Sequence, residues 1–229
     1  MEQETFAGDK KLPMTSLLAR PERRFIDYFV PRVPRFIEGY HLTLMTIVWS
    51  AGMILFGWLA RADIRWLGGS CVMLFLQWFT DSFDGALGRY RDTGIPKWGY
   101  YMDHFLDYIF MCAILVGYSF ILRPASRHLL FLVLPVYGAF MVSAYLSFAV
   151  TNQFKITYLG LGPTELRIIL ILLNVVIMIF GVRVLESALP WLLGVFTLGL
   201  FVIVYRTQRY IWNREREEKR KHLTGVKQT

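Results

Sequence analysis

Four aspartates at helical spacing are the residues of this chain best suited to chemistry. They lie in the stretch TDSFDGALGRYRDTGIPKWGYYMDHFLDY, residues 80–108, as two pairs: Asp81 with Asp84, and Asp103 with Asp107. Residues three or four apart share one face of a helix, so we expect the two pairs to meet in one cavity. Four carboxylates that lie close together repel one another unless cations separate them. Oxygen ligands of this kind select hard divalent ions, so the pattern predicts a site for Mg²⁺ or Mn²⁺.

The residues that follow the first pair favour a phosphorylated ligand. Gly85 and Gly88 leave the helix without side chains beside the aspartates, and Arg89 supplies a forked cation that suits phosphate. Together these features indicate phosphoryl transfer from a metal-bound diphosphate. The alternative is that the aspartates are helix caps and interfacial ion pairs. Ionisable residues inside apolar spans are usually functional, so we prefer a site.

The elements that must position these residues are membrane helices. The chain has 229 residues, of which 55% are hydrophobic, and its mean hydropathy is +0.42. Several apolar runs reach or approach the ~18–20 residues that cross a bilayer as a helix. We therefore predict an all-α integral membrane protein whose catalytic domain, residues 37–210, has six transmembrane helices, at about 40–60, 66–89, 98–122, 128–149, 163–184 and 189–205.

Both ends of the chain differ from this domain. Residues 1–36 form an N-terminal arm whose later part mixes apolar and basic residues. This part predicts an amphipathic helix lying in the membrane interface and broken at Pro31 and Pro34; the alternative is a basic arm that only orients the first span. Residues 211–229 form a basic tail, and the chain from residue 206 onward is expected to be helical or disordered.

The charge distribution predicts the orientation. The formal net charge is +8, and the basic residues flank apolar spans, so we expect anionic lipid and an anionic substrate as partners, and no nucleic acid. Six spans place both termini on one side. Twenty of the 25 Lys and Arg residues fall on that side and five on the other, which predicts cytoplasmic termini and an active site at the cytoplasmic face.

The remaining sequence signals add little to function. Cys71 and Cys112 lie in apolar segments, so buried free thiols are a better interpretation than a disulfide or a metal site. The first 40 residues lack the apolar core of a cleavable signal peptide, and there is no lipidation motif.

The aspartate stretch resembles the signature of the CDP-alcohol phosphotransferases, also called CDP-alcohol phosphatidyltransferases: D-x2-D-G-x2-A-R-x8–9-G-x3-D-x3-D. Seven of its eight fixed positions match at the right spacing. The exception is Gly88, where the family usually has alanine, and this change keeps the position small. The matching residues are Asp81, Asp84, Gly85, Arg89, Gly99, Asp103 and Asp107.

The resemblance implies a reaction and a set of roles. Members of this family transfer a phosphoryl-alcohol group from a CDP-alcohol to an alcohol acceptor and release CMP. By this likeness, Asp81, Asp84, Asp103 and Asp107 would bind two Mg²⁺ or Mn²⁺ ions, and Asp107 would also be the catalytic base. The nucleotide site would comprise Asp81, Gly85, Gly88, Arg89 and Gly99. Family members are typically homodimers with an interfacial N-terminal helix.

Three further residues bear on the substrate. Glu165, in the segment Gly-Pro-Thr-Glu at 162–165, and His104, next to Asp103, resemble features of the choline/ethanolamine phosphotransferase branch. Glu165 would then face an amine headgroup. The preferred interpretations are that the segment is an ordinary helix start and that His104 sits at the membrane interface. Arg167 is expected either to face a phosphate or, as the preferred interpretation, to snorkel to the membrane surface.

We therefore expect a metal-dependent enzyme of phospholipid biosynthesis that uses a CDP-aminoalcohol and diacylglycerol. The alternative within the family uses CDP-diacylglycerol and a small polar alcohol. Two further rivals are an aspartate-rich prenyltransferase, whose motifs and larger number of spans fit less well, and a membrane transporter whose aspartates bind a cation.

Overall fold

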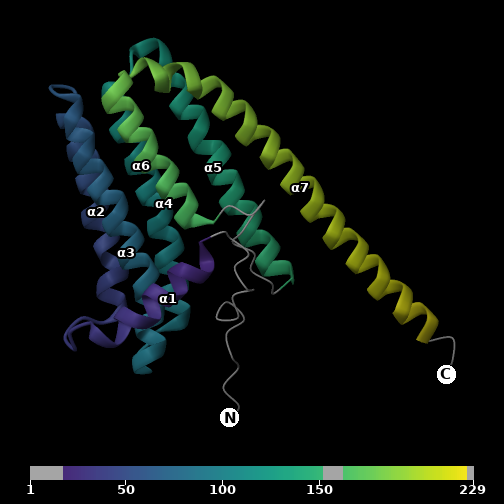
Figure 1. Ribbon diagram of the computed structural model, residues 1–229. Coiled ribbons are helices and arrows are strands. Elements are labelled where there is room, and N and C mark those ends of the chain that lie inside the picture. The colour runs from purple at the N-terminus through teal and green to yellow at the C-terminus, as the bar shows by residue number, and fades with distance from the viewer. Residues whose placement is uncertain (1–17, 152–161, 226–229) are drawn as a thin grey trace.

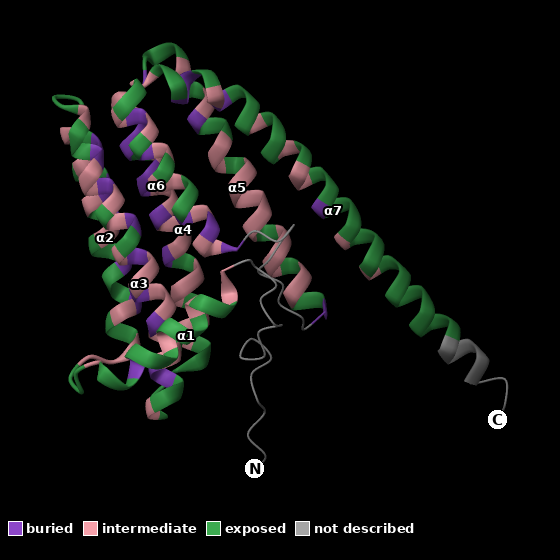
Figure 2. Cartoon of the chain, in the orientation of Figure 1, coloured by how far each residue is buried: buried purple, intermediate pink, exposed green. Residues whose placement is uncertain are grey.

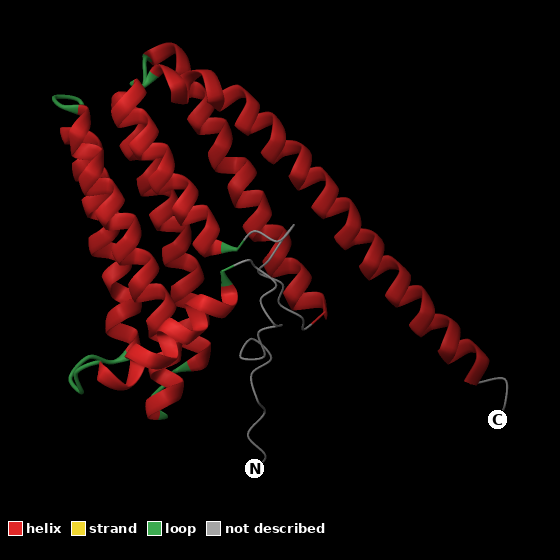
Figure 3. Cartoon of the chain, in the orientation of Figure 1, coloured by secondary structure: helices red, strands yellow, loops and turns green. Residues whose placement is uncertain are grey.

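The computed structural model describes residues 18–151 and 162–225, and every regular element in these ranges is a helix (Figure 3). The N-terminal residues 1–17, most of the loop expected at 151–162 and the last four residues of the basic tail lie outside this description. The elements are α1 (Ala19–Phe29), the short 3-10 helix η2 (Val30–Arg32), α2 (Gly39–Leu59), the 3-10 helix η3 (Ile64–Trp66), α3 (Leu67–Arg91), α4 (Pro96–Ile121), α5 (Pro124–Thr151), α6 (Pro163–Phe180) and α7 (Arg183–Gly225).

The all-helical membrane architecture is confirmed, but the count of six spans is not. Five of the described helices are long and apolar enough to cross a membrane: α2, α4, α5, α6 and α7. The helix α3 is also long, at 25 residues, but it is not among them. Its C-terminal half carries Gln77, Asp81 and Asp84, and these polar side chains lower its hydropathy. The sixth span therefore remains a prediction.

Two helix ends differ from the predicted boundaries. The helix α6 stops at Phe180 rather than near residue 184, because Gly181 adopts a φ of 85°, which is open to glycine but strained for other residues. The helix α7 continues without a break from the apolar segment into the charged tail as far as Gly225. Ion pairs at i,i+4 spacing, such as Arg214 with Glu218 at 3.2 Å, support the helical alternative for this part of the tail.

Four helices form the tightest part of the bundle. The helix α2 packs against both α3 and α4, and α3 also packs against α6. A Cβ atom on Gly57 of α2 would lie only 2.4 Å from the Cα of Gly117 on α4, so the two glycines allow the backbones to approach closely, as small residues do in membrane helices. The main apolar core includes Met53, Leu74 and Ile177 from three of these helices. This group is the frame that carries the aspartates.

The helices α5 and α7 pack on each other and diverge from the four-helix group (Figure 1). In α5 only Leu130 and Thr151 are buried. Large apolar side chains such as Trp191 and Leu198 stay exposed on α7, and Figure 2 shows long exposed stretches on this helix. Such apolar surface suits contact with lipid or with another membrane protein rather than with water.

The helix α1 crosses the bundle at the end where α3 finishes and α4 begins (Figure 1). Its Glu22 accepts hydrogen bonds from Trp78 Nε1 at 3.0 Å, from Ser82 Oγ at 3.0 Å and from Thr164 Oγ1 at 2.9 Å. These donors belong to α3 and α6, so one carboxylate fastens α1 to both helices. The helix gives way at Phe29 to a 3-10 turn that contains Pro31, as the sequence predicts; its place in the membrane interface stays a prediction.

The segment between η2 and α2 is held by the end of α3. The Arg91 guanidinium donates to the backbone carbonyls of Ile37 at 2.5 Å, Val33 at 2.7 Å and Pro34 at 3.1 Å. Carbonyls in an irregular segment need such donors, because no helix supplies them. Arg91 thereby fixes the entry of α2 beside the C-terminal turn of α3, where the aspartates lie.

Candidate metal and nucleotide site

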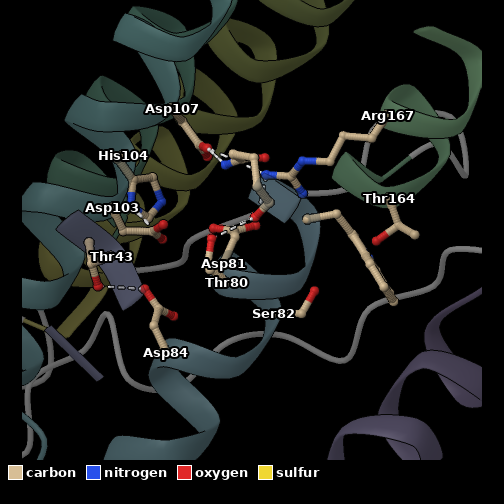
Figure 4. A network of polar contacts seen from close by, with 12 residues as sticks. Thr43, Thr80, Asp81, Ser82, Asp84, Asp103, His104, Asp107, Thr164 and Arg167 are labelled. Carbon is tan, nitrogen blue, oxygen red and sulfur yellow. Dashed lines mark hydrogen bonds and ion pairs between the residues drawn. The ribbon is translucent and has the colours of Figure 1, made fainter. Parts of the chain in front are cut away.

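Three of the four aspartates converge. Asp81 comes from α3, whereas Asp103 and Asp107 come from the first turns of α4, and Figure 4 shows their carboxylates turned toward one space. One carboxylate oxygen from each lies within 4.8 Å of the others, and all three residues are half-buried. The prediction that the two pairs meet therefore holds for three residues of the four.

Asp84 lies apart from this cluster. Its Oδ2 accepts a hydrogen bond from Thr43 Oγ1 of α2 at 2.6 Å (Figure 4). A Cβ on Gly39 would lie 2.6 Å from the Asp84 carbonyl oxygen, so α2 begins directly against this turn of α3. Asp84 follows Asp81 by three residues, which is a rotation of about 300° around the helix axis. Asp84 thus differs from Asp81 both in its direction around the axis and in its position along it. Asp84 therefore faces the neighbouring cavity.

That cavity has a volume of about 230 Å³ and adjoins the aspartate cluster through Asp103. Four of the five residues assigned to the nucleotide from the sequence line it, namely Gly85, Gly88, Arg89 and Gly99; Asp81 does not. A Cβ on Gly85 would come within 3.2 Å of the Arg89 Nη1, so the glycine leaves room for the guanidinium to lie along the helix. The cavity thus combines exposed backbone, the Arg89 guanidinium and the aspartates Asp84, Asp92 and Asp103.

Arg167 reaches the aspartates from α6. Its Nη2 lies 2.8 Å from Asp81 Oδ2 and 3.5 Å from Asp107 Oδ1 (Figure 4). The residue is only 8% exposed, so the prediction that it snorkels to the surface is wrong. The physical reason is that α6 packs against α3, and a buried guanidinium finds its partners in two carboxylates instead of in water.

Gln77 is a site residue that the sequence reasoning missed. It lies on α3 one turn before Asp81, is 1% exposed, and donates from Nε2 to Asp107 Oδ1 at 3.1 Å. Its Oε1 is buried without a hydrogen-bond partner among the described residues. A single amide inside an apolar run, four residues before an aspartate, was the signal that could have identified it, because such residues share a helix face.

The two other candidate substrate residues have different surroundings. His104 lines the cavity, and its Nδ1 lies 2.8 Å from the Tyr100 carbonyl oxygen. Glu165 is buried at the start of α6, where its Oε2 accepts from the Gly162 N–H at 2.9 Å and its Oε1 accepts from the Leu18 N–H at 3.1 Å. These contacts match the helix-start interpretation of Glu165 and also tie α6 to the beginning of α1.

The charges of the cluster fit a divalent cation. Three carboxylates face one another; Arg167 contacts two of them, Asp81 and Asp107, and the His104 Nδ1 lies 3.6 Å from Asp103 Oδ2. One guanidinium cannot balance three carboxylates in a half-buried space, and the surplus favours a bound cation. All three ligands are hard oxygen donors, which suit Mg²⁺ or Mn²⁺ better than softer metals.

Comparison with known proteins identifies the family. The family model of the CDP-alcohol phosphatidyltransferases matches residues 40–204, which include the four aspartates, Arg167 and all the residues that line the cavity except Gly39. No curated protein and no solved structure matches the chain. The match spans well over half of the 229 residues and agrees with the helical architecture and the aspartate geometry. The chain therefore belongs to the CDP-alcohol phosphatidyltransferase family.

Proposed function

We propose that this protein is a metal-dependent membrane enzyme that transfers a phosphoryl-alcohol group from a CDP-alcohol to an alcohol acceptor and releases CMP. The family implies phospholipid synthesis by this class of transfer. The observation that carries the proposal for this chain is the meeting of Asp81, Asp103 and Asp107 within 4.8 Å, beside a cavity that is lined by Gly85 and Arg89.

The carboxylates are proposed as the metal ligands. Asp81, Asp103 and Asp107 would hold the cations, and Asp84 would join them from the cavity wall. When bound, two Mg²⁺ or Mn²⁺ ions would supply Lewis-acid stabilisation to the diphosphate and to the departing phosphate of CMP. Arg89 would bind a phosphate oxygen through its forked donors, and the bare backbone at Gly85 and Gly88 would admit the nucleotide.

Asp107 is proposed as the general base. Both of its described contacts, from Gln77 and Arg167, engage Oδ1, so Oδ2 can accept a proton. In the proposed step, the acceptor hydroxyl oxygen forms a bond to the phosphorus that carries the alcohol. The bond from that phosphorus to the CMP oxygen breaks, and the hydroxyl proton passes to Asp107. A base beside a displaced phosphate is what an in-line transfer requires.

The donor is proposed to be a CDP-aminoalcohol and the acceptor diacylglycerol. His104 supports this assignment because it lines the cavity, whereas Glu165 no longer does, since it accepts backbone hydrogen bonds at a helix start. The position of Arg167 inside the aspartate cluster favours a second candidate, which is transfer from CDP-diacylglycerol to a small polar alcohol that carries a phosphate.

One assay separates the two candidates. CMP release is measured in liposomes with each donor in turn, together with the matching acceptor. Release with CDP-choline or CDP-ethanolamine supports the first candidate, and release only with CDP-diacylglycerol overturns it in favour of the second. A cation transporter, the rival of another class, predicts ion flux into the same liposomes and no CMP release.

We further propose six spans, with both termini and the active site on the cytoplasmic side. One support is the 20-to-5 division of basic residues between the two sides. The other is that α3 packs against α2 and α6, which are both long and apolar enough to cross a membrane. Cysteines introduced at the exposed positions Arg61 and Lys97 test the orientation in intact cells. An impermeant maleimide is expected to label the first variant and not the second; the reverse pattern would contradict the orientation.

A homodimer is proposed as the working unit. The exposed apolar side chains of α7, such as Trp191, Val195 and Leu198, offer surface that a second copy or lipid must cover. Mass measurement of the protein in native nanodiscs checks this. The expected particle contains two chains, and a single chain at all concentrations would contradict it.

A further inference from the structure

Arg167 occupies an unusual position for a basic residue beside a proposed metal site. Its side chain is 9% exposed, and it enters the aspartate cluster from α6, which packs against α3 (Figure 4). It lies 2.8 Å from Asp81 Oδ2 and 3.5 Å from Asp107 Oδ1. These are two of the three carboxylates whose oxygens lie together, so the guanidinium already provides part of the positive charge that the cluster needs.

A guanidinium and a divalent ion cannot use the same carboxylate oxygens without cost. A metal such as Mg²⁺ binds carboxylate oxygen at about 2.0–2.1 Å, and the Arg167 Nη2 already contacts one oxygen of Asp81 at 2.8 Å and one of Asp107 at 3.5 Å. Two cations held at one carboxylate in a half-buried site also repel each other strongly, because the local dielectric is lower than that of water. Binding of one must therefore weaken the hold of the other.

We propose that Arg167 is an internal counter-ion that competes with the divalent cation for Asp81 and Asp107. Without metal, Arg167 balances part of the carboxylate charge and keeps α6 joined to α3 and α4. When metal binds, the guanidinium yields its place on the carboxylates. Arg167 is thus a positioning residue that sets how tightly the site holds its metal. The inference rests on the proposed function, from which it takes the metal site.

Manganese binding tests the competition directly. The full-length protein in nanodiscs is titrated with Mn²⁺, without nucleotide, and free Mn²⁺ is measured by electron paramagnetic resonance. The Arg167→Gln variant is expected to bind Mn²⁺ about tenfold more tightly than the parent protein, a typical coupling between two linked sites. Arg61→Gln removes the same charge at the other end of the bundle and is expected to leave the affinity unchanged.

Thermal unfolding supplies a readout that a merely structural arginine would not move. In EDTA, Arg167→Gln is expected to melt below the parent protein, and saturating Mn²⁺ should shrink this difference. An arginine that only packs helices together would cost the same stability in both conditions. Should Arg167→Gln fail to fold, Arg167→Lys serves in its place. Its Mn²⁺ affinity is expected to be higher than that of the parent, because an ammonium lacks the forked guanidinium that spans two carboxylates. It should remain lower than the affinity expected for Arg167→Gln, because lysine keeps the positive charge.

The possible failures are distinguishable. In the first, the parent protein binds Mn²⁺, the Arg167 variants bind it equally or less tightly, and Mn²⁺ does not change the difference in melting temperature. This result overturns the competition and leaves the proposed function standing. Parent protein that binds no Mn²⁺ overturns the proposed metal site itself, and the competition with it.

Discussion

Two arginine–carboxylate clusters lie at opposite ends of the bundle, and their composition differs. At the end away from the aspartates, Arg123 Nε donates to Glu186 at 2.7 Å and 2.9 Å, and the Arg123 backbone N–H adds a bond of 3.0 Å. One cation meets one carboxylate there. At the other end, Arg167 contacts Asp81 and Asp107 while a third carboxylate lies beside them.

The difference helps to distinguish a charge cluster that only stabilises the fold from one that also binds a ligand. The Arg123–Glu186 pair is balanced and its oxygens are occupied by donors, so it clamps the start of α7 to the turn before α5 and needs no ligand. The aspartate cluster places three carboxylates around one guanidinium, and this surplus of negative charge favours a bound cation. The two clusters also differ in burial, because the Arg123 side chain is 70% exposed and that of Arg167 is 9% exposed.

The largest effect is expected from Asp103→Asn, which removes one carboxylate from the surplus cluster. Loss of a metal ligand should lower the rate of CMP release by at least about 100-fold, because ligand-supporting groups alone are worth 10–100-fold. The melting temperature should stay the same or rise, since like charges are relieved. Asp63→Asn is the matched control: it neutralises an aspartate at the other end of the bundle, where Asn can still cap η3, and should keep full activity.

A smaller effect is expected at Gln77, which is uncharged and contacts the cluster through a hydrogen bond to Asp107. In Gln77→Leu the Asp107 carboxylate loses its amide donor, so kcat should fall by about tenfold while KM for the CDP-alcohol stays within about twofold. Steady-state kinetics provide the check. A rise in KM with unchanged kcat would mean that Gln77 acts on substrate binding instead of positioning Asp107.

Glu186→Gln tests the balanced pair. The side chain of Glu186 is buried, but that of Arg123 is 70% exposed, so solvent screens the pair and its loss should lower the free energy of unfolding only modestly. Thermal melting in nanodiscs is expected to show the loss, with Mn²⁺ affinity as in the parent. A changed metal affinity would remove the distinction between the two clusters.

The smallest effect is expected from Glu22→Gln, at the same end as the aspartates but with its carboxylate already satisfied by three donors. The amide keeps one acceptor, so global stability should drop by no more than about 1 kcal/mol. Hydrogen exchange should show faster opening of α1, with α3 and α6 unchanged. Equal acceleration in all three helices would mean that Glu22 supports the bundle as a whole.

The sequence predicted the helical membrane fold and the residues of the cluster, because both depend on local patterns. Apolar runs of sufficient length indicate spans, and i,i+3 or i,i+4 spacing indicates a shared face. The exception among the spans is α3, where the same aspartates that reveal the site also lower the hydropathy of the helix that carries them. Function and hydropathy conflict there.

The contacts between distant segments could not be predicted in the same way. Arg167 is 86 residues from Asp81 in the sequence, and only the packing of α6 on α3 makes them partners. The separation of Asp84 from the other three aspartates likewise depends on α2, whose Thr43 and Gly39 approach that turn of α3. The spacing of residues along one helix does not indicate which other helix packs beside each of them.

The central claim is that Asp107 takes the acceptor proton in a metal-dependent transfer from a CDP-alcohol. It is tested most directly by CMP release in liposomes with Mg²⁺, comparing the parent protein with Asp107→Asn, alongside binding of CDP to both. We expect CMP release by the parent that EDTA abolishes, and an Asp107→Asn variant that still binds CDP but is reduced in turnover by at least about 100-fold. Turnover by Asp107→Asn at the parent rate would contradict it.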